Sequence, residues 1–133
     1  APGFGKEAII SLEFCDEIII VSNPTLSSYF DSLKCFQIAK NLNKKVLGVI
    51  INKFEKNSPV TPKDFEMVEG LPIIGVIKES KMAKISEMRR SLLYDLDRNF
   101  KKEIDLIVSK ITGFEVRESG VKQKIMNIFS WIR

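Results

Sequence analysis

The chain has 133 residues, of which 44% are hydrophobic and 29% charged, and its formal net charge is +4. These proportions are those of ordinary globular domains, so they exclude a disordered chain, and the length suits one domain rather than two. With no histidine and two cysteines, Cys15 and Cys35, zinc sites and histidine-based catalysis are excluded, and we expect two buried free thiols.

Targeting signals are also weak. No apolar run approaches the roughly 18 residues that span a membrane, and the first residues do not resemble a signal peptide. We therefore expect a cytoplasmic protein that is at most peripheral to a membrane. The basic bias, with a pI of about 9.1, is compatible with an anionic partner but does not require one.

The first elements are a helix, a strand and a second helix. After the loop APGFG, a helix is expected whose Ala8, Ile9 and Leu12 would pack on a sheet. The Ile- and Val-rich run 17–23 does not alternate with polar residues, which predicts a strand covered on both faces. Apolar residues on roughly one face predict a helix over 26–42.

The middle of the chain repeats this order. The run VLGVIIN at 46–52 predicts a second covered strand. A helix over 61–70 follows, with Thr61 as its N-cap, Pro62 in its first turn and Gly70 as the glycine that closes it.

The last third predicts one strand, at 71–77, followed by two helices. The first helix, at 82–90, is polar, and the second runs from 95 to 112, where Gly113 ends it. The long helix carries a core stripe at regular helical spacing, made of Phe100, Ile104, Ile107, Val108 and Ile111.

Strands alternating with helices predict an α/β fold, with a parallel sheet that has helices on both faces. Three strands make a narrow parallel sheet, and one edge would expose Val- and Ile-rich backbone. No strand precedes the first helix. We therefore expect residues 1–113 to be the C-terminal part of a larger α/β domain whose first part lies upstream of Ala1.

Four short motifs occur in order along the chain. They are Pro2-Gly3, then Cys15-Asp16-Glu17-Ile18 with Asn23-Pro24, then VIINKF at 49–54, and LPIIGVIKES at 71–80. In this order and spacing they resemble the MinD/ParA-type P-loop ATPases, especially archaeal MinD-like proteins. The resemblance covers nearly the whole chain and implies that residues 1–113 are the C-terminal portion of such an ATPase domain.

The resemblance also implies a nucleotide site. Gly3 corresponds to the loop after the Walker B Asp, and Asn52 to the Asn that reads the adenine edge, for which an amide offers both donor and acceptor. Lys78, Glu79 and Ser80 correspond to the loop that walls the base on its other side. The family usually has Pro in place of Lys78 and often Asp in place of Ser80, so this wall is expected to be looser.

The phosphate half of that site is not found in this sequence. Residues 3–8, GFGKEA, have neither the GxxxxGK[ST] spacing nor a preceding strand. The resemblance implies ATP and Mg²⁺ as cofactors of a complete protein, with the catalytic Lys and the Walker B Asp upstream. No catalytic or metal-binding residue is assigned here, and we expect the chain alone neither to bind nucleotide tightly nor to hydrolyse ATP.

The final residues form a separate segment. Residues 114–120 are interpreted as a linker, and 121–133 predict an amphipathic helix with an apolar arc of about 160°. The bland alternative is a helix that docks on its own domain. The lack of acidic residues after Glu118 favours an anionic membrane surface instead, and the family resemblance implies a membrane-targeting helix. The membrane-binding residues are Val121, Lys122, Lys124, Ile125, Ile128, Phe129, Trp131, Ile132 and Arg133.

Together these features indicate a MinD-like ATPase that positions division or other surface apparatus. It would cycle between the cytosol and the inner face of the membrane as ATP drives formation of a homodimer, with a regulatory partner that the sequence does not identify. Two alternatives stay open. One is a soluble ParA-superfamily ATPase for DNA partition or flagellar placement, although DNA does not require Phe129, Trp131 and Ile132 on one helical face. The other is a stand-alone interaction module without nucleotide chemistry.

Overall fold

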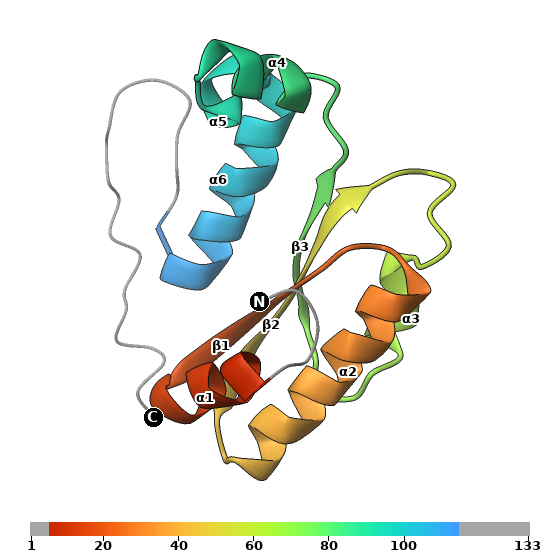
Figure 1. Cartoon of the computed structure of the whole chain (residues 1–133), viewed down its shortest axis with the longest axis vertical. Helices are drawn as coiled ribbons and strands as arrows, with labels where there is room; N and C mark the ends of the chain where they lie inside the picture. The colour runs from red at the N-terminus through yellow and green to blue at the C-terminus, as the bar shows by residue number, and fades with distance from the viewer. Residues whose placement is uncertain (1–5, 115–133) are drawn as a thin grey trace. The chain divides into compact units, whose positions relative to one another are not determined.

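The computed structural model describes residues 6–114, which divide into two compact units, 6–79 and 80–114 (Figure 1). The first unit holds α1 (Lys6–Phe14), β1 (Glu17–Ser22), α2 (Leu26–Asn41), β2 (Lys45–Phe54), α3 (Pro62–Glu66) and β3 (Ile73–Lys78). The second holds α4 (Ala83–Arg89), α5 (Leu93–Leu96) and α6 (Arg98–Thr112). Gly3, residues 115–120 of the predicted linker and the predicted membrane helix 121–133 lie outside the described residues.

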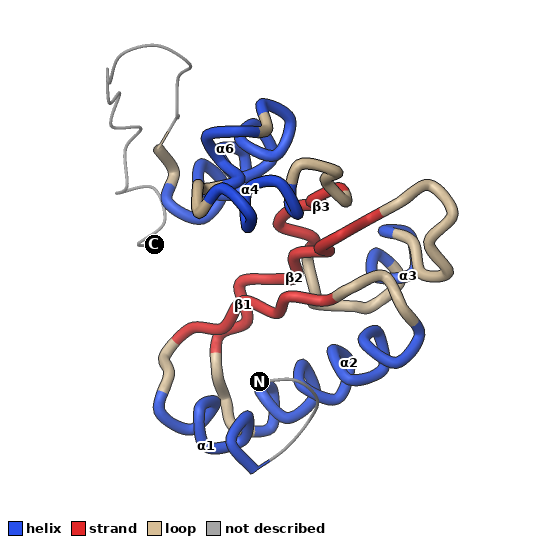
Figure 2. The backbone as a smooth tube through the Cα atoms, turned by 45° about the horizontal axis from the view of Figure 1, so that its top comes forward, coloured by secondary structure: helices blue, strands red, loops and turns tan. Residues whose placement is uncertain are grey.

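The strands form a parallel three-stranded sheet in the order β1-β2-β3, which confirms the predicted α/β class. In the first unit α1, α2 and α3 lie on one side of this sheet (Figure 2). The central strand β2 is buried on both faces, as its unbroken apolar run predicts. The edge strand β1 differs from the prediction, because its side chains alternate and Ile19 and Val21 are exposed.

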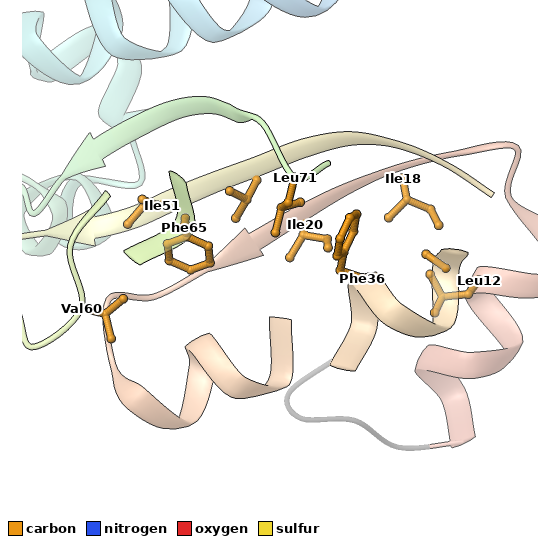
Figure 3. Close-up of a cluster of buried hydrophobic side chains, with 10 residues drawn as sticks. Leu12, Ile18, Ile20, Phe36, Ile51, Val60, Phe65 and Leu71 are labelled. Carbon is orange, nitrogen blue, oxygen red and sulfur yellow. The ribbon is translucent and has the colours of Figure 1, made fainter. Parts of the chain in front are cut away.

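The core of the first unit lies between the sheet and its helices (Figure 3). Leu12 is buried there as expected, but Ile9 is exposed, so α1 packs through a narrower face than predicted. The Phe65 ring is fully buried and meets the Tyr29 ring edge to face at 4.9 Å. The core side chains are Leu12, Ile18, Ile20, Phe36, Ala39, Val49, Ile51, Val60, Phe65 and Leu71.

The segment that precedes β3 is a short helix followed by a turn. Thr61 caps α3 as predicted, and the Asp64 carboxylate accepts hydrogen bonds from the Thr61 N–H at 2.7 Å and its hydroxyl at 2.8 Å. These bonds lower the pKa of Asp64. The helix stops at Glu66, well before the predicted end. Gly70, with φ +82°, therefore belongs to the turn after α3 and is not its closing residue.

Gly48 allows β2 and β3 to approach closely. Its φ is +144°, and a Cβ there would lie 2.3 Å from the carbonyl oxygen of Pro72. The same oxygen accepts a hydrogen bond from the Val49 N–H at 2.9 Å. Only glycine satisfies both the backbone conformation and the space at this position.

The second unit consists of α4, α5 and α6. The long helix begins at Arg98 rather than near residue 95, because the Asp97 carboxylate caps it by accepting from the N–H groups of Asn99 and Phe100 at 2.9 and 3.1 Å. The preceding residues form α5, which the sequence did not predict. Gly113, with φ +73°, ends α6 as predicted.

The predicted core stripe of α6 is buried only in part. Ile107 is buried, whereas Val108 and Ile111 are exposed in this structure. The Tyr94 hydroxyl donates to the Asp105 carboxylate at 2.6 Å, which joins α5 to α6 and raises the pKa of Tyr94. Within residues 6–114, no helix has the length and apolarity needed to cross a membrane.

Candidate functional site

The predicted base-side residues lie at the carboxyl ends of two neighbouring strands. Asn52 is near the end of β2, Lys78 is the last residue of β3, and Glu79 follows it. The register pairs Phe54 with Lys78, and the Glu79 N–H donates to the Phe54 carbonyl oxygen at 3.1 Å. The fold thus brings three of the predicted residues together at the carboxyl-terminal end of the parallel sheet, which is where ligands of such folds bind.

A β-bulge shapes this edge. Ile51 pairs with Val76 and Phe54 with Lys78, so Asn52 and Lys53 of β2 lie opposite one residue of β3. Lys53 has φ +58°, a left-handed conformation that is costly for a residue with a long side chain. Bulges and strained residues are found next to binding sites because they redirect side chains. The bulge therefore marks Asn52 and Lys53 independently of the sequence motif.

The Asn52 amide is available to a ligand. Its residue is half-buried, and among the described residues its side chain makes no hydrogen bond. An amide presents one acceptor and two donors, which matches the alternating donor and acceptor edge of adenine. Its side chain thus offers both kinds of hydrogen-bonding group near the carboxyl end of β2.

The predicted wall beyond β3 divides into two parts. Lys78 and Glu79 are exposed members of the first unit, whereas Ser80 is half-buried and begins the second. The Ser80 hydroxyl donates to the Asp97 carboxylate and accepts from the Met82 N–H at 3.1 Å. In this structure Ser80 therefore stabilises the start of α6 through Asp97.

Asp97 gathers these hydrogen bonds on one carboxylate. The Ser80 hydroxyl and, after it, the Phe100 N–H lower the pKa of Asp97, because both donate to its ionised form. Asp97 is thus negatively charged at neutral pH.

Among residues 6–114 no three His, Cys, Asp or Glu side chains lie close enough together to form a metal site.

The loops after β1 and β2 are tied together near the same edge. Val60 is buried, and its N–H donates to the Pro24 carbonyl oxygen at 3.4 Å. Ser22, the last residue of β1, is also buried and its hydroxyl donates to the Asn23 carbonyl oxygen at 3.2 Å. Neither contact was predicted. Val60 is a loop residue, whose burial the sequence signals only weakly, whereas Ser22 lies within the predicted strand 17–23. Lys53 follows Asn52 within the VIINKF motif, but the sequence did not indicate the β-bulge that contains both residues.

The chain resembles parts of three curated proteins, although no family model matches it. It is 37% identical over 78 residues to an uncharacterized ATP-binding protein of Methanocaldococcus jannaschii, and this match covers 58% of the present chain and 30% of that protein. It is 34% identical over 114 residues to another uncharacterized protein of the same organism, and this match covers 74% of the present chain and 42% of that protein. A probable cobyric acid synthase of Methanosarcina mazei is 30% identical over 122 residues, covering 84% and 25%. The chain therefore spans less than half the length of these relatives.

Two solved structures share the fold. The cell-division ATPase MinD of Pyrococcus furiosus has a TM-score of 0.71 and 20% identity, over 84% of this chain and 48% of that one. The septum site-determining protein MinD of Pyrococcus horikoshii, solved with Mg-ADP, has a TM-score of 0.64 and 19% identity, over 73% and 41%. At these identities the comparison shows the fold: the chain has the fold of MinD over less than half of the MinD chain, as the sequence resemblance implied.

Proposed function

We propose that this chain is the base-recognising and membrane-binding portion of a MinD-like ATPase. The complete protein binds ATP with Mg²⁺, dimerises in the ATP-bound state and thereby gains membrane affinity. It positions division or other surface apparatus from the inner face of the cell membrane. This chain supplies Asn52 and the loop from Lys78 onward, and the phosphate-binding half of the site is supplied by residues outside it.

One observation carries the proposal. On the fold of MinD, an amide without a hydrogen-bond partner among the described residues lies in a bulge at the carboxyl end of β2, beside the loop that leaves β3. The left-handed Lys53 belongs to the same bulge, and bulges and strained residues of this kind are often found beside ligand sites, which supports a ligand role.

The membrane part of the proposal depends on residues 121–133. Their sequence combines a wide apolar arc with basic residues and a single tryptophan, the composition of a helix that lies in a membrane interface. One such helix binds weakly and reversibly. Two helices on a dimer would bind far more tightly through effective concentration, which would couple nucleotide state to membrane residence.

The base contact is tested in the complete ATPase that contains these residues. Asn52→Ala should weaken ATP binding about tenfold, because a hydrogen-bonded edge is lost. GTP binding should change much less. Asn52→Asp should also weaken ATP binding, since a carboxylate cannot donate to an adenine nitrogen acceptor. Isothermal titration calorimetry with both nucleotides measures the difference.

Asn57→Ala is the matched control, because Asn57 is an exposed amide in the loop after β2. It should leave both affinities unchanged. Equal losses for ATP and GTP in Asn52→Ala would show that Asn52 maintains the local structure and does not read the base.

A further inference from the structure

The segment around α4 carries an exposed surface that combines apolar and basic side chains. Met88 and Leu92 are 77% and 70% exposed, and Ile85 is exposed beside them. The basic members are Lys84, Arg89 and Arg90, which are also exposed. We call these six residues the α4 surface.

The orientation of α4 explains this exposure. Ser86 is buried, so its side is the covered side of the helix, and its hydroxyl donates to the Ala83 carbonyl oxygen within α4 at 2.7 Å. At about 100° per residue, Lys84 and Met88 lie on the opposite side. Arg90 then ends the helix in a left-handed conformation, with φ +52°. A long apolar side chain and a basic one therefore project together, away from the buried side.

The charges of the α4 surface are not neutralised within the described part of the chain. Lys84, Arg89 and Arg90 form no ion pair there. The only acidic residue between positions 81 and 92 is Glu87. An anionic partner would meet both uncompensated positive charge and apolar side chains that extend into solvent.

Two exposed apolar sites of the first unit lack this combination. Met67 is 85% exposed, but Glu66 and Glu69 flank it. Leu26 and Phe30 on α2 are exposed next to the Asp31–Lys34 ion pair, which is close to neutral. Nucleic acid would pair with the basic residues of the α4 surface but has no use for Met88 and Leu92. A lipid surface uses both kinds of side chain, because methionine and leucine enter the acyl boundary while lysine and arginine contact phosphates.

We propose that the α4 surface is a second membrane-contact site, which binds anionic lipid headgroups in addition to the anchor proposed for residues 121–133. The proposal rests on the membrane association described under the proposed function. It adds a contact on the folded part of the chain. With two contacts per chain, the membrane would constrain the orientation of the second unit and not only its distance from the bilayer.

Co-sedimentation of the full chain with phosphatidylcholine vesicles, with and without phosphatidylglycerol, tests this site. Met88→Glu should lower the partition coefficient on anionic vesicles about fivefold. Lys84→Glu/Arg89→Glu should lower it by more than about 25-fold, because each basic residue near an anionic surface contributes about fivefold and the new carboxylates are repelled. These side chains are exposed, so thermal melting followed by circular dichroism should show unchanged folding.

Two control variants carry the same chemical changes elsewhere. Met67→Glu replaces a still more exposed methionine, and Lys56→Glu/Lys63→Glu makes the same change in net charge on exposed lysines of the first unit. Both should stay within about twofold of the parent chain, since neither changes a residue of the α4 surface. Phe129→Glu/Trp131→Glu reports on the tail separately.

The outcomes separate the two membrane proposals. If the α4 variants partition like their controls while the tail variant loses binding, the α4 proposal is wrong and the anchor stands. If the α4 variants lose binding while the tail variant does not, the anchor is wrong. If the parent chain does not bind anionic vesicles, both membrane proposals are wrong. If the α4 variants bind vesicles normally but lose affinity for duplex DNA, the partner of this surface is nucleic acid.

Discussion

Gly48 shows how one residue sets the spacing of two strands. The Pro72 carbonyl oxygen lies 2.3 Å from the position that a Cβ would take, and it accepts a hydrogen bond from the Val49 N–H. The glycine therefore allows β3 to begin pairing with β2 at this point. A larger residue has to move the backbone of one strand, because the atom in the way belongs to the main chain.

Gly48→Ala should lower the free energy of unfolding by about 3 kcal/mol, through backbone strain and overpacking together. Urea denaturation followed by circular dichroism measures it. Gly113→Ala is the control, since Gly113 also has a positive φ but nothing lies within 4 Å of its Cβ position. That variant should lose only about 1 kcal/mol. Similar losses in both would mean that the contact with Pro72 costs nothing.

The structural roles of some residues could be predicted from their sequence neighbours, whereas the roles of others could not. Thr61, Pro62 and Gly113 were predicted correctly because caps and stops depend on their immediate neighbours. Asn52 was selected by a motif, and its position at a sheet edge follows from the strand that contains it. The left-handed Lys53 was not predictable, since its conformation depends on the register between β2 and β3.

At the scale of elements, α6 depends on a carboxylate that also receives the Ser80 hydroxyl. Asp97 begins the helix by accepting two backbone N–H groups, and Ser80 donates to the same side chain. The loop after β3 and the start of α6 are therefore held by one charged group. Protonation of Asp97 would weaken both connections at once.

Asp97→Asn should be less stable than the parent chain at neutral pH. The pKa of Asp97 is lowered by folding, so its ionised form stabilises the native state above the unfolded-state pKa of about 4. This contribution is lost as the pH falls through the lowered native pKa. The gap between variant and parent in urea midpoint should therefore close below about pH 4. A gap that persists in acid would show that the carboxylate charge is not the cause.

Asp95→Asn is the control for that experiment. Asp95 is exposed in α5, and its side chain makes no hydrogen bond among the described residues.

The helices of the second unit show which elements hydrophobic periodicity predicts and which it misses. The stripe of α6 predicted a long helix correctly, but α5 was missed because four residues are too short for a periodic signal.

For the whole molecule, the edge strand β1 is the feature with the widest effect. The order of the sheet leaves the outer backbone of β1 without a neighbouring strand in the described residues, and Val21 is 62% exposed. Exposed edges rich in Ile and Val pair readily with other chains. The alternation of β1 could not be predicted, because an unbroken apolar run looks the same whether or not its second face is covered.

The chain should self-associate increasingly as its concentration rises, and Val21→Lys should reduce this association. Analytical ultracentrifugation over a range of concentrations measures it. Met67→Lys, at a still more exposed residue distant in sequence from β1, should have no effect. A monomer at every concentration, melting cooperatively, would contradict the interpretation of β1 as a strand that lacks its neighbour.

The close approach at Gly48 also has a genetic consequence. Every missense change in a glycine codon adds a Cβ atom, so each one would place that atom against the Pro72 oxygen. No conservative amino-acid replacement exists at this position, whatever its chemical character. Any replacement at this codon must therefore be accompanied by a shift of the main chain of β2 or of the Pro72 segment.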